Sequence, residues 1–304
     1  MRGDARNAEQ LRSRIATTVR SVVVAGWLAL AAGAWLAGLV HPALRAEDGA
    51  ARTLTTAALW LAYGLVLGGL LLPGSRGLTV ARIGVPAGAA QLVVASAADS
   101  FEAVGWVGLI GGLAATVVVL QPVYAEAHVD AASYGDERRF LLRPPGPVVV
   151  AVVVPVWAVA VAGVAAGPLL LTGAGWAAGI VAAAVGLPIA AVAAHILFRL
   201  ARRWLVFVPN GLVVHDHMAV AEPLPLGRRG VASIGPARAE TTAADLTAQA
   251  FGMALELRLN APVKIGVMTG RNRSEERSLT ALLLSPSRPA AVLATAERRG
   301  LKLA

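Results

Sequence analysis

Two long apolar runs decide how this chain folds. They are Val148–Leu171, VVVAVVVPVWAVAVAGVAAGPLLL, and Trp176–Leu200, WAAGIVAAAVGLPIAAVAAHILFRL, separated only by Thr172–Gly175. A bilayer hydrocarbon core about 30 Å thick requires roughly 20 apolar residues in a helix that rises about 1.5 Å per residue. Each run is therefore long enough to cross a membrane, and the pair predicts a transmembrane helical hairpin.

The composition of the whole chain agrees with this prediction. Of its 304 residues, 57% are hydrophobic and only 15% are charged, whereas soluble domains carry about 25% charged residues. The absence of cysteine excludes disulfides, thiolate metal sites and a cysteine nucleophile. A net charge of +9 suggests nucleic-acid binding in a soluble protein, but basic loops of membrane proteins are first of all topology signals. We expect membrane lipids as partners, no nucleic acid and no cofactor.

Four further apolar segments precede the hairpin. They are Ser21–Val40, Leu54–Leu72, Leu78–Ala98 and Ala103–Val123. The third contains Arg82, and only about sixteen residues lie between this arginine and Asp99, so we expect Arg82 to extend toward the interface from a short helix. The sequence thus predicts a polar N-terminal segment (1–20), a six-span transmembrane domain (21–202) and a C-terminal domain (203–304).

The arginines predict the orientation of these spans. With six spans both termini lie on one side of the membrane, and the loops opposite contain only Arg45 and Arg52. Since positively charged loops stay in the cytoplasm, we expect a multi-pass protein of the cytoplasmic (inner) membrane with both termini cytoplasmic. Thirteen arginines lie on the side of the termini: Arg2, Arg6, Arg12, Arg14, Arg20, Arg76, Arg82, Arg138, Arg139, Arg143, Arg199, Arg202 and Arg203.

Candidate interaction residues of the membrane half are few. Glu126, His128 and Asp130 lie in the polar connection Gln121–Pro147. Glu126 and Asp130 are spaced i,i+4, which allows an oxygen-rich metal site, although His128 lies about 200° around the helix from Glu126. The other interpretation is a helix extension that ends at Gly135 and an ion-paired loop that contacts the C-terminal domain or a partner. His195, about a turn and a half from the end of the last span, is either a proton or ligand group or a solvated interfacial residue.

From Arg203 onward the sequence has the pattern of strands, and Asn210-Gly211 is typical of a hairpin turn. His215 and His217 face the same way on a strand, but a third zinc ligand is not evident. An apolar-periodic helix, Ala290–Arg299, follows Ser287 as its expected N-cap. The expected strands are Trp204–Val208, Leu212–Asp216, Ala219–Leu226, Val231–Ile234, Met253–Leu259, Val263–Val267 and Leu279–Leu284, with a polar insertion at Thr241–Ala250 that is a short helix or flexible.

About seven strands followed by one helix, entered through Arg202-Arg203-Trp204 and closed through Ser285-Pro286, resemble the pleckstrin-homology-like (PH-like) domains of bacterial membrane proteins. The whole chain resembles uncharacterised multi-span actinobacterial proteins that carry such a domain. The resemblance implies a β-rich domain closed by one helix, which binds phospholipid headgroups or protein segments. Lipid-binding members usually place basic residues in the first hairpin, where this chain has Pro209-Asn210-Gly211.

The sequence commits the chain to no reaction, and we predict no catalytic residue. We expect a helical bundle that holds a PH-like module for assembly, scaffolding or regulation at the inner leaflet, with a possible protein partner there. The alternative is a transporter of small solutes or lipids that uses the bundle. Four basic residues, Arg228, Arg229, Arg271 and Arg273, form a lipid-binding patch if they share one edge of the domain; otherwise they are solvated turn residues.

The orientation is testable with reporters that are active only in the cytoplasm. Fusions after Ser75 and after Leu200 should be active, because both positions are expected on the arginine-rich side of the membrane. A fusion after Ala50, on the opposite side, should be silent. Activity at Ala50 together with silence at Leu200 would contradict the orientation.

Overall fold

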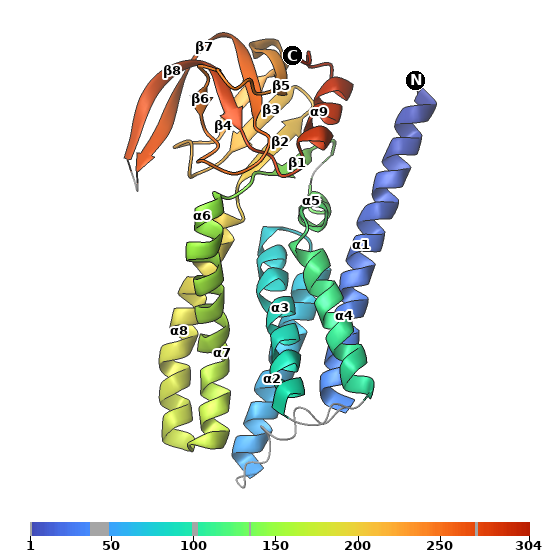
Figure 1. Cartoon of the computed structure of the whole chain (residues 1–304), viewed down its shortest axis with the longest axis vertical. Coiled ribbons are helices and arrows are strands. Elements are labelled where there is room, and N and C mark those ends of the chain that lie inside the picture. Colours follow the sequence, from blue (N-terminus) through green and yellow to red (C-terminus); the bar gives the residue numbers. More distant parts are fainter. Residues whose placement is uncertain (1, 37–48, 99–102, 134, 271–272) are drawn as a thin grey trace. The chain divides into compact units, whose positions relative to one another are not determined.

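The computed structural model describes residues 2–36, 49–98, 103–133, 135–270 and 273–304. The chain divides into two compact units (Figure 1). The first, the helical unit, comprises Met1–Ala131 and Pro155–Phe198, and the second, the β-rich unit, comprises Ala132–Val154 and Arg199–Ala304. Each unit is therefore built from two separate stretches of the chain.

Six helices of the described chain are long and apolar enough to cross a membrane, which confirms the predicted number of segments able to span. The segment around Arg82, for which we expected a short helix, lies in an unbroken helix that includes Pro86. The candidate spans are Ser13–Ala34 in α1 (Arg2–Leu36), α2 (Gly49–Leu71), Ser75–Val94 in α3 (Ser75–Ala98), α4 (Ala103–Leu120), Val149–Gly173, which includes α7 (Val154–Gly173), and α8 (Trp176–Leu200).

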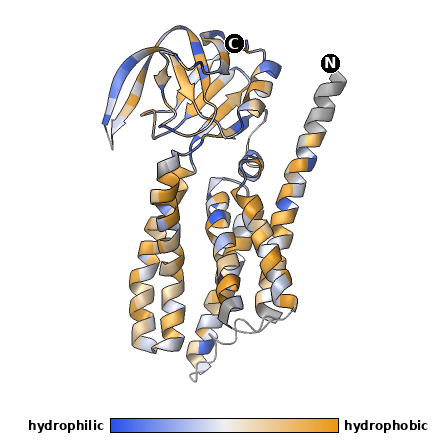
Figure 2. Ribbon diagram, in the orientation of Figure 1, coloured by the Kyte–Doolittle hydropathy of each residue, from blue (hydrophilic) through white to orange (hydrophobic). Residues whose placement is uncertain are grey.

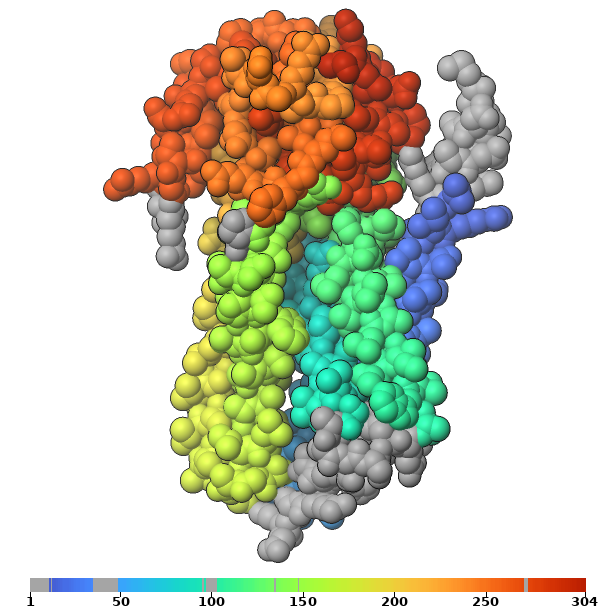
Figure 3. Space-filling model, in the orientation of Figure 1, coloured from blue at the N-terminus to red at the C-terminus, as the bar shows by residue number. Residues whose placement is uncertain are grey.

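The span helices expose large apolar side chains on their outer faces. On α4, Val107, Ile110 and Val117 are 60–64% exposed, and Figure 2 shows α4, α7 and α8 as mostly hydrophobic. The space-filling view shows the side chains of α4 and α7 covering this face of the helical unit (Figure 3). Such surfaces are unfavourable in water and favourable against lipid chains, as expected of membrane spans.

Glycines bring neighbouring helices of the helical unit into close contact. A Cβ atom placed on Gly33 of α1 would lie 2.6 Å from the Cα of Gly108 in α4, and one on Gly163 of α7 would lie 2.5 Å from the carbonyl oxygen of Gly186 in α8. Lipid tails provide no hydrophobic drive for helix association, so this backbone proximity and the dispersion contacts it permits hold the helices together.

The β-rich unit contains two four-stranded sheets. The first has the order β1-β2-β3-β4, all antiparallel, and the second has the order β5-β7-β8-β6. The first sheet is formed by β1 (Arg138–Leu141), β2 (Trp204–Val208), β3 (Gly211–His215) and β4 (Leu224–Gly227), and the second by β5 (Val231–Pro236), β7 (Leu255–Gly270), β8 (Arg273–Leu284) and the short β6 (Ala244–Asp245); α9 (Pro289–Arg298) follows them.

The side chains that alternate along these strands form one core. Leu205 and Phe207 of β2 and Leu212 and Val214 of β3 are completely buried together with Val292 of α9. The expected strand at 263–267 and all but the first two residues of the one at 253–259 belong to the single strand β7, and the insertion at 241–250 contains β6. Ser287 does not cap α9, because the helix begins after Arg288 and the Ser287 hydroxyl donates instead to the Leu141 carbonyl.

Strand β1 is the main difference from the sequence prediction. We expected residues 121–147 to form a helix extension to Gly135 and a loop, whereas α5 (Pro122–Asp130) ends earlier and β1 pairs along its whole length with β2. The β-rich unit therefore begins at Ala132 rather than at Arg203, and the two spans of the α7–α8 hairpin are inserted between its first and second strands. The π-helical turn Val149–Val153 and the three-residue α6 (Gly146–Val148) lead from β1 into α7.

Candidate functional site: the hairpin root and the α5 cap

A buried ion pair lies where the chain returns from the last span. The Arg203 Nε and Nη2 groups donate to the Asp216 carboxylate oxygens Oδ1 and Oδ2 at 2.8 and 2.7 Å, and the two side chains are 1% and 0% exposed. The third guanidinium nitrogen, Nη1, donates to the Arg143 carbonyl at 2.8 Å. We call these three residues, Arg143, Arg203 and Asp216, the hairpin root. They join the segment that leads into α7 to the segment that follows α8.

Backbone hydrogen bonds extend the same junction. The Leu142 amide donates to the Arg203 carbonyl at 2.9 Å, and the Arg143 amide donates to the Ser285 carbonyl at 2.8 Å. The Met218 amide donates to Asp216 Oδ1 at 3.1 Å, so the carboxylate accepts three hydrogen bonds. The sequence suggested that Arg203 was a topology signal at the membrane interface; its side chain is instead buried inside the β-rich unit.

His215 and His217 flank the buried Asp216. His215 and His217 are partly buried, and desolvation lowers the pKa of both imidazoles; Arg202 lowers that of His215 further, while Asp216 opposes the shift in each. Within the residues the structure describes, no group of three His, Cys, Asp or Glu side chains is placed to bind a metal ion. The carboxylate between the histidines is instead committed to Arg203.

A second buried polar group lies on α5, which packs against α1, α3 and α4. Its residues Tyr124, Glu126 and His128, which we call the α5 cap, are 0%, 2% and 0% exposed. Asp130, at the end of the helix, is partly exposed. The structure thus places the three sequence candidates of this segment on one short helix, and it adds Tyr124, whose ring stacks on His128 with 5.4 Å between centroids.

The geometry fixes the protonation of His128. Its Nε2 lies 3.0 Å from the Leu72 carbonyl oxygen, an acceptor, so Nε2 carries the hydrogen. Desolvation and the charge of Arg20 lower the pKa of His128 to about 4, and burial raises the pKa of Tyr124 to about 12. Both side chains are therefore neutral at pH 7. His128 Nδ1 and the Tyr124 hydroxyl have no hydrogen-bond partner among the described residues.

Two arginines of the spans bind the carboxyl ends of neighbouring helices. Arg82 Nε donates to the Val119 carbonyl of α4 at 3.2 Å, and Arg20 Nη2 donates to the Leu71 carbonyl of α2 at 3.4 Å. The last carbonyls of a helix have no intrahelical donor and carry partial negative charge. The hydrogen bond from Arg82 to the Val119 carbonyl explains how α3 accommodates an arginine within a candidate span.

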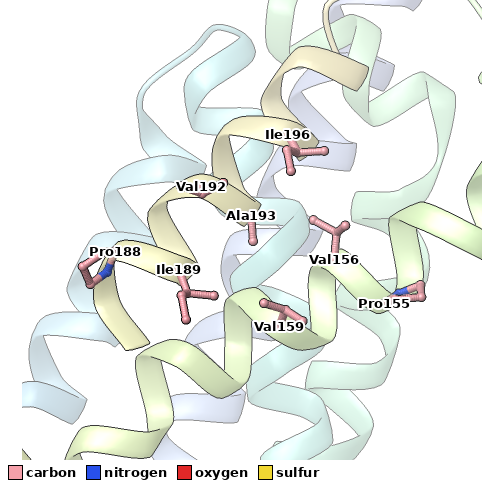
Figure 4. A pocket seen from close by; sticks show the side chains of 8 residues that line it. All are labelled: Pro155, Val156, Val159, Pro188, Ile189, Val192, Ala193 and Ile196. Atoms are coloured by element: carbon pink, nitrogen blue, oxygen red, sulfur yellow. The ribbon is translucent and has the colours of Figure 1, made fainter. Parts of the chain in front are cut away.

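An apolar groove lies between α7 and α8 (Figure 4). Its volume is about 390 Å³, and its lining includes Pro155, Val159, Pro188 and Ile196 but no polar side chain. It is suited to an apolar group such as a lipid acyl chain and offers nothing for acid–base chemistry. His195 does not line this groove; its side chain is exposed and lies near Phe198, with 6.4 Å between the rings.

The sequence left open whether Arg228, Arg229, Arg271 and Arg273 share one edge of the domain, and the structure describes three of them. Arg228 and Arg229 are exposed in the 3-10 turn Arg228–Gly230, where the Arg229 carbonyl accepts a hydrogen bond from Asn260 of β7. Arg273 is opposite Gly270, ten residues farther along β7, which corresponds to about 30 Å of strand. Arg271 lies outside the described residues. Arg228 and Arg229 therefore do not share one short edge with Arg273.

Comparisons of the chain with protein-family models, with curated proteins and with solved structures find no match. Sequence reasoning identified the polar residues of α5 but missed the hairpin root. One signal was present in the sequence: Asp216 ends an apolar strand, and a buried carboxylate requires a cationic or hydrogen-bonding partner.

Breaking the hairpin root should destabilise the β-rich unit. Arg203→Met leaves the buried Asp216 charge without its partner and should cost about 3–5 kcal/mol, measured by urea denaturation in mild detergent. The double variant Arg203→Met/Asp216→Leu should recover part of the loss, because it removes the uncompensated charge. Arg277→Met is the matched control: its partner Glu275 is 59% exposed, so the cost should stay below about 1 kcal/mol. Equal losses for Arg203→Met and Arg277→Met would contradict this role.

Protonation of His128 should destabilise the helical unit. The folded-state pKa of about 4 lies below the ordinary value of 6.5, so the unfolded chain binds more protons between these values. Stability should be complete above pH 6.5 and fall as the pH decreases toward 4. His128→Gln keeps a neutral donor near Leu72 and removes the titration, so its thermal stability should depend less on pH over this range. The same pH slope in both proteins would show that His128 is not responsible.

Proposed function

We propose that this chain is a non-enzymatic protein of the cytoplasmic membrane that holds a PH-like module at the inner leaflet for assembly, scaffolding or regulation. The main support for this proposal is the hairpin root, which joins the two segments that flank the α7–α8 hairpin. Both ends of the α7–α8 hairpin continue into strands of one sheet, and Arg203 joins them through Asp216 and the Arg143 carbonyl. A pair of spans rooted at both ends in a folded unit tethers that unit to the membrane more firmly than one flexible linker does.

The PH-like assignment is supported by two four-stranded sheets and a following helix, α9, whose Val292 and Ala296 are buried in the same core. The cytoplasmic orientation is supported by the arginine asymmetry of the sequence. The neutral state of His128 and Tyr124 at pH 7 favours a structural role for the α5 cap over proton transfer. The proposed partners are membrane lipids and a protein at the cytoplasmic face.

Photocrosslinking in cells tests the scaffolding role. A photoreactive residue is placed at Arg229, Thr242 or Thr280, which are exposed positions of the β-rich unit, and at Leu113 of α4 as a lipid-facing control. We expect one discrete protein adduct from at least one position of the β-rich unit and none from Leu113. The absence of protein adducts from all three positions, with solute movement by the purified chain in proteoliposomes, would contradict the proposal and favour a transporter.

A further inference from the structure

An exposed apolar loop of the β-rich unit lies beside the start of a span. Phe251 and Met253 expose 71% and 53% of their surfaces, although the chain between β6 and β7 is otherwise rich in small and polar residues. A single exposed apolar residue is common on soluble domains and requires no explanation. Two exposed apolar residues within three consecutive positions, held in a defined conformation, do require one.

The conformation of this loop is fixed by Arg143. Arg143 Nη1 donates to the Phe251 carbonyl at 2.9 Å, and Nη2 donates to the Ser287 carbonyl at 3.3 Å. Gly252 between the two apolar residues has a φ of +104°, and a Cβ atom there would overlap the Arg143 guanidinium. The loop is therefore packed against the same residue whose carbonyl accepts a hydrogen bond from Arg203 in the hairpin root.

The Phe251 ring lies directly against Gly146, where a Cβ atom would overlap it. Gly146 is the first residue of α6 and precedes the first residue of the span, Val149, by three positions, or about 4.5 Å along a helix. Val150, about one turn beyond Gly146 and so on the same face, is 74% exposed. The ring is thus level with the end of the span, where headgroups meet acyl chains and where aromatic side chains are enriched in membrane proteins.

We propose that Phe251 and Met253 insert into the interfacial layer of the bilayer that α7 crosses, with the phospholipid surface as their partner. The loop then gives the β-rich unit a membrane contact in addition to its covalent connections to α7 and α8. Arg143, bonded behind the loop, lies at the level of the anionic headgroups, where a cation is favourable. The inference requires one part of the proposed function, namely that the candidate span Val149–Gly173 crosses a bilayer.

Site-specific fluorescence tests this inference on the full chain in proteoliposomes. Because the natural chain has no cysteine, single variants Phe251→Cys and Met253→Cys can each carry one bimane label. Asn210→Cys, in the turn at the far end of β2 from the last span, is the aqueous control, and Val159→Cys, an exposed position of α7, is the control for membrane depth. The liposomes contain lipids with a nitroxide at the headgroup or deep in the acyl chain.

The labels at 251 and 253 should lose fluorescence mainly to the headgroup nitroxide, the label at 159 mainly to the deep nitroxide, and the label at 210 to neither. Met253→Cys retains Phe251, so it reports on the loop even if the other variant folds poorly. Quenching at both 251 and 253 no stronger than at 210, with deep quenching at 159 intact, would overturn the inference and leave the span assignment standing. Loss of quenching at 159 would instead refute the membrane placement on which the proposed function depends.

Discussion

The buried ion pair between Arg203 and Asp216 is the interaction on which the β-rich unit depends. Two charges removed from water require close geometry and additional hydrogen bonds to be tolerated. Here the guanidinium donates three hydrogen bonds and the carboxylate accepts three. Because the donated bonds reach both Asp216, the residue after β3, and Arg143 in the segment after β1, one side chain links the stretch that leads into α7 with the stretch that follows α8. Arg203 lies three residues after Leu200, the last residue of α8.

The span helices and most strands are predictable from local sequence. Apolar runs such as Trp176–Leu200 have one stable conformation in lipid, since only a helix satisfies its own backbone hydrogen bonds there. The alternating Leu205 and Phe207 reveal a half-buried strand in the same way. Strand β1 is different: it has four residues, two of them arginines, and its partner lies more than sixty residues later in the sequence. Nothing in its local pattern distinguishes it from a charged loop.

The candidate sites show the same division between local and distant information. Glu126 and His128 stand out as polar residues in an apolar chain, so they were identified from sequence, but their burial depends on how α5 packs against other helices. Arg203 and Asp216 are thirteen residues apart, directly before β2 and directly after β3, and their pairing appears only when these two strands are aligned. Arg229 lies beside Asn260 and Arg273 beside Gly270, so the length of β7 separates the two arginines. The composition of the chain does not reveal this separation.

Hydrogen exchange of the full chain in a lipid bilayer tests most directly whether β1 and the hairpin root belong to the β-rich unit. The amides of Phe140, Leu142 and Arg143 should exchange slowly, because the antiparallel register directs the first two toward β2 and the Arg143 amide donates to the Ser285 carbonyl. In Arg203→Met the two segments should lose protection together. Rapid exchange of the Phe140, Leu142 and Arg143 amides in the natural chain, with β2 and β3 still protected, would contradict a unit that is rooted at both ends of the hairpin.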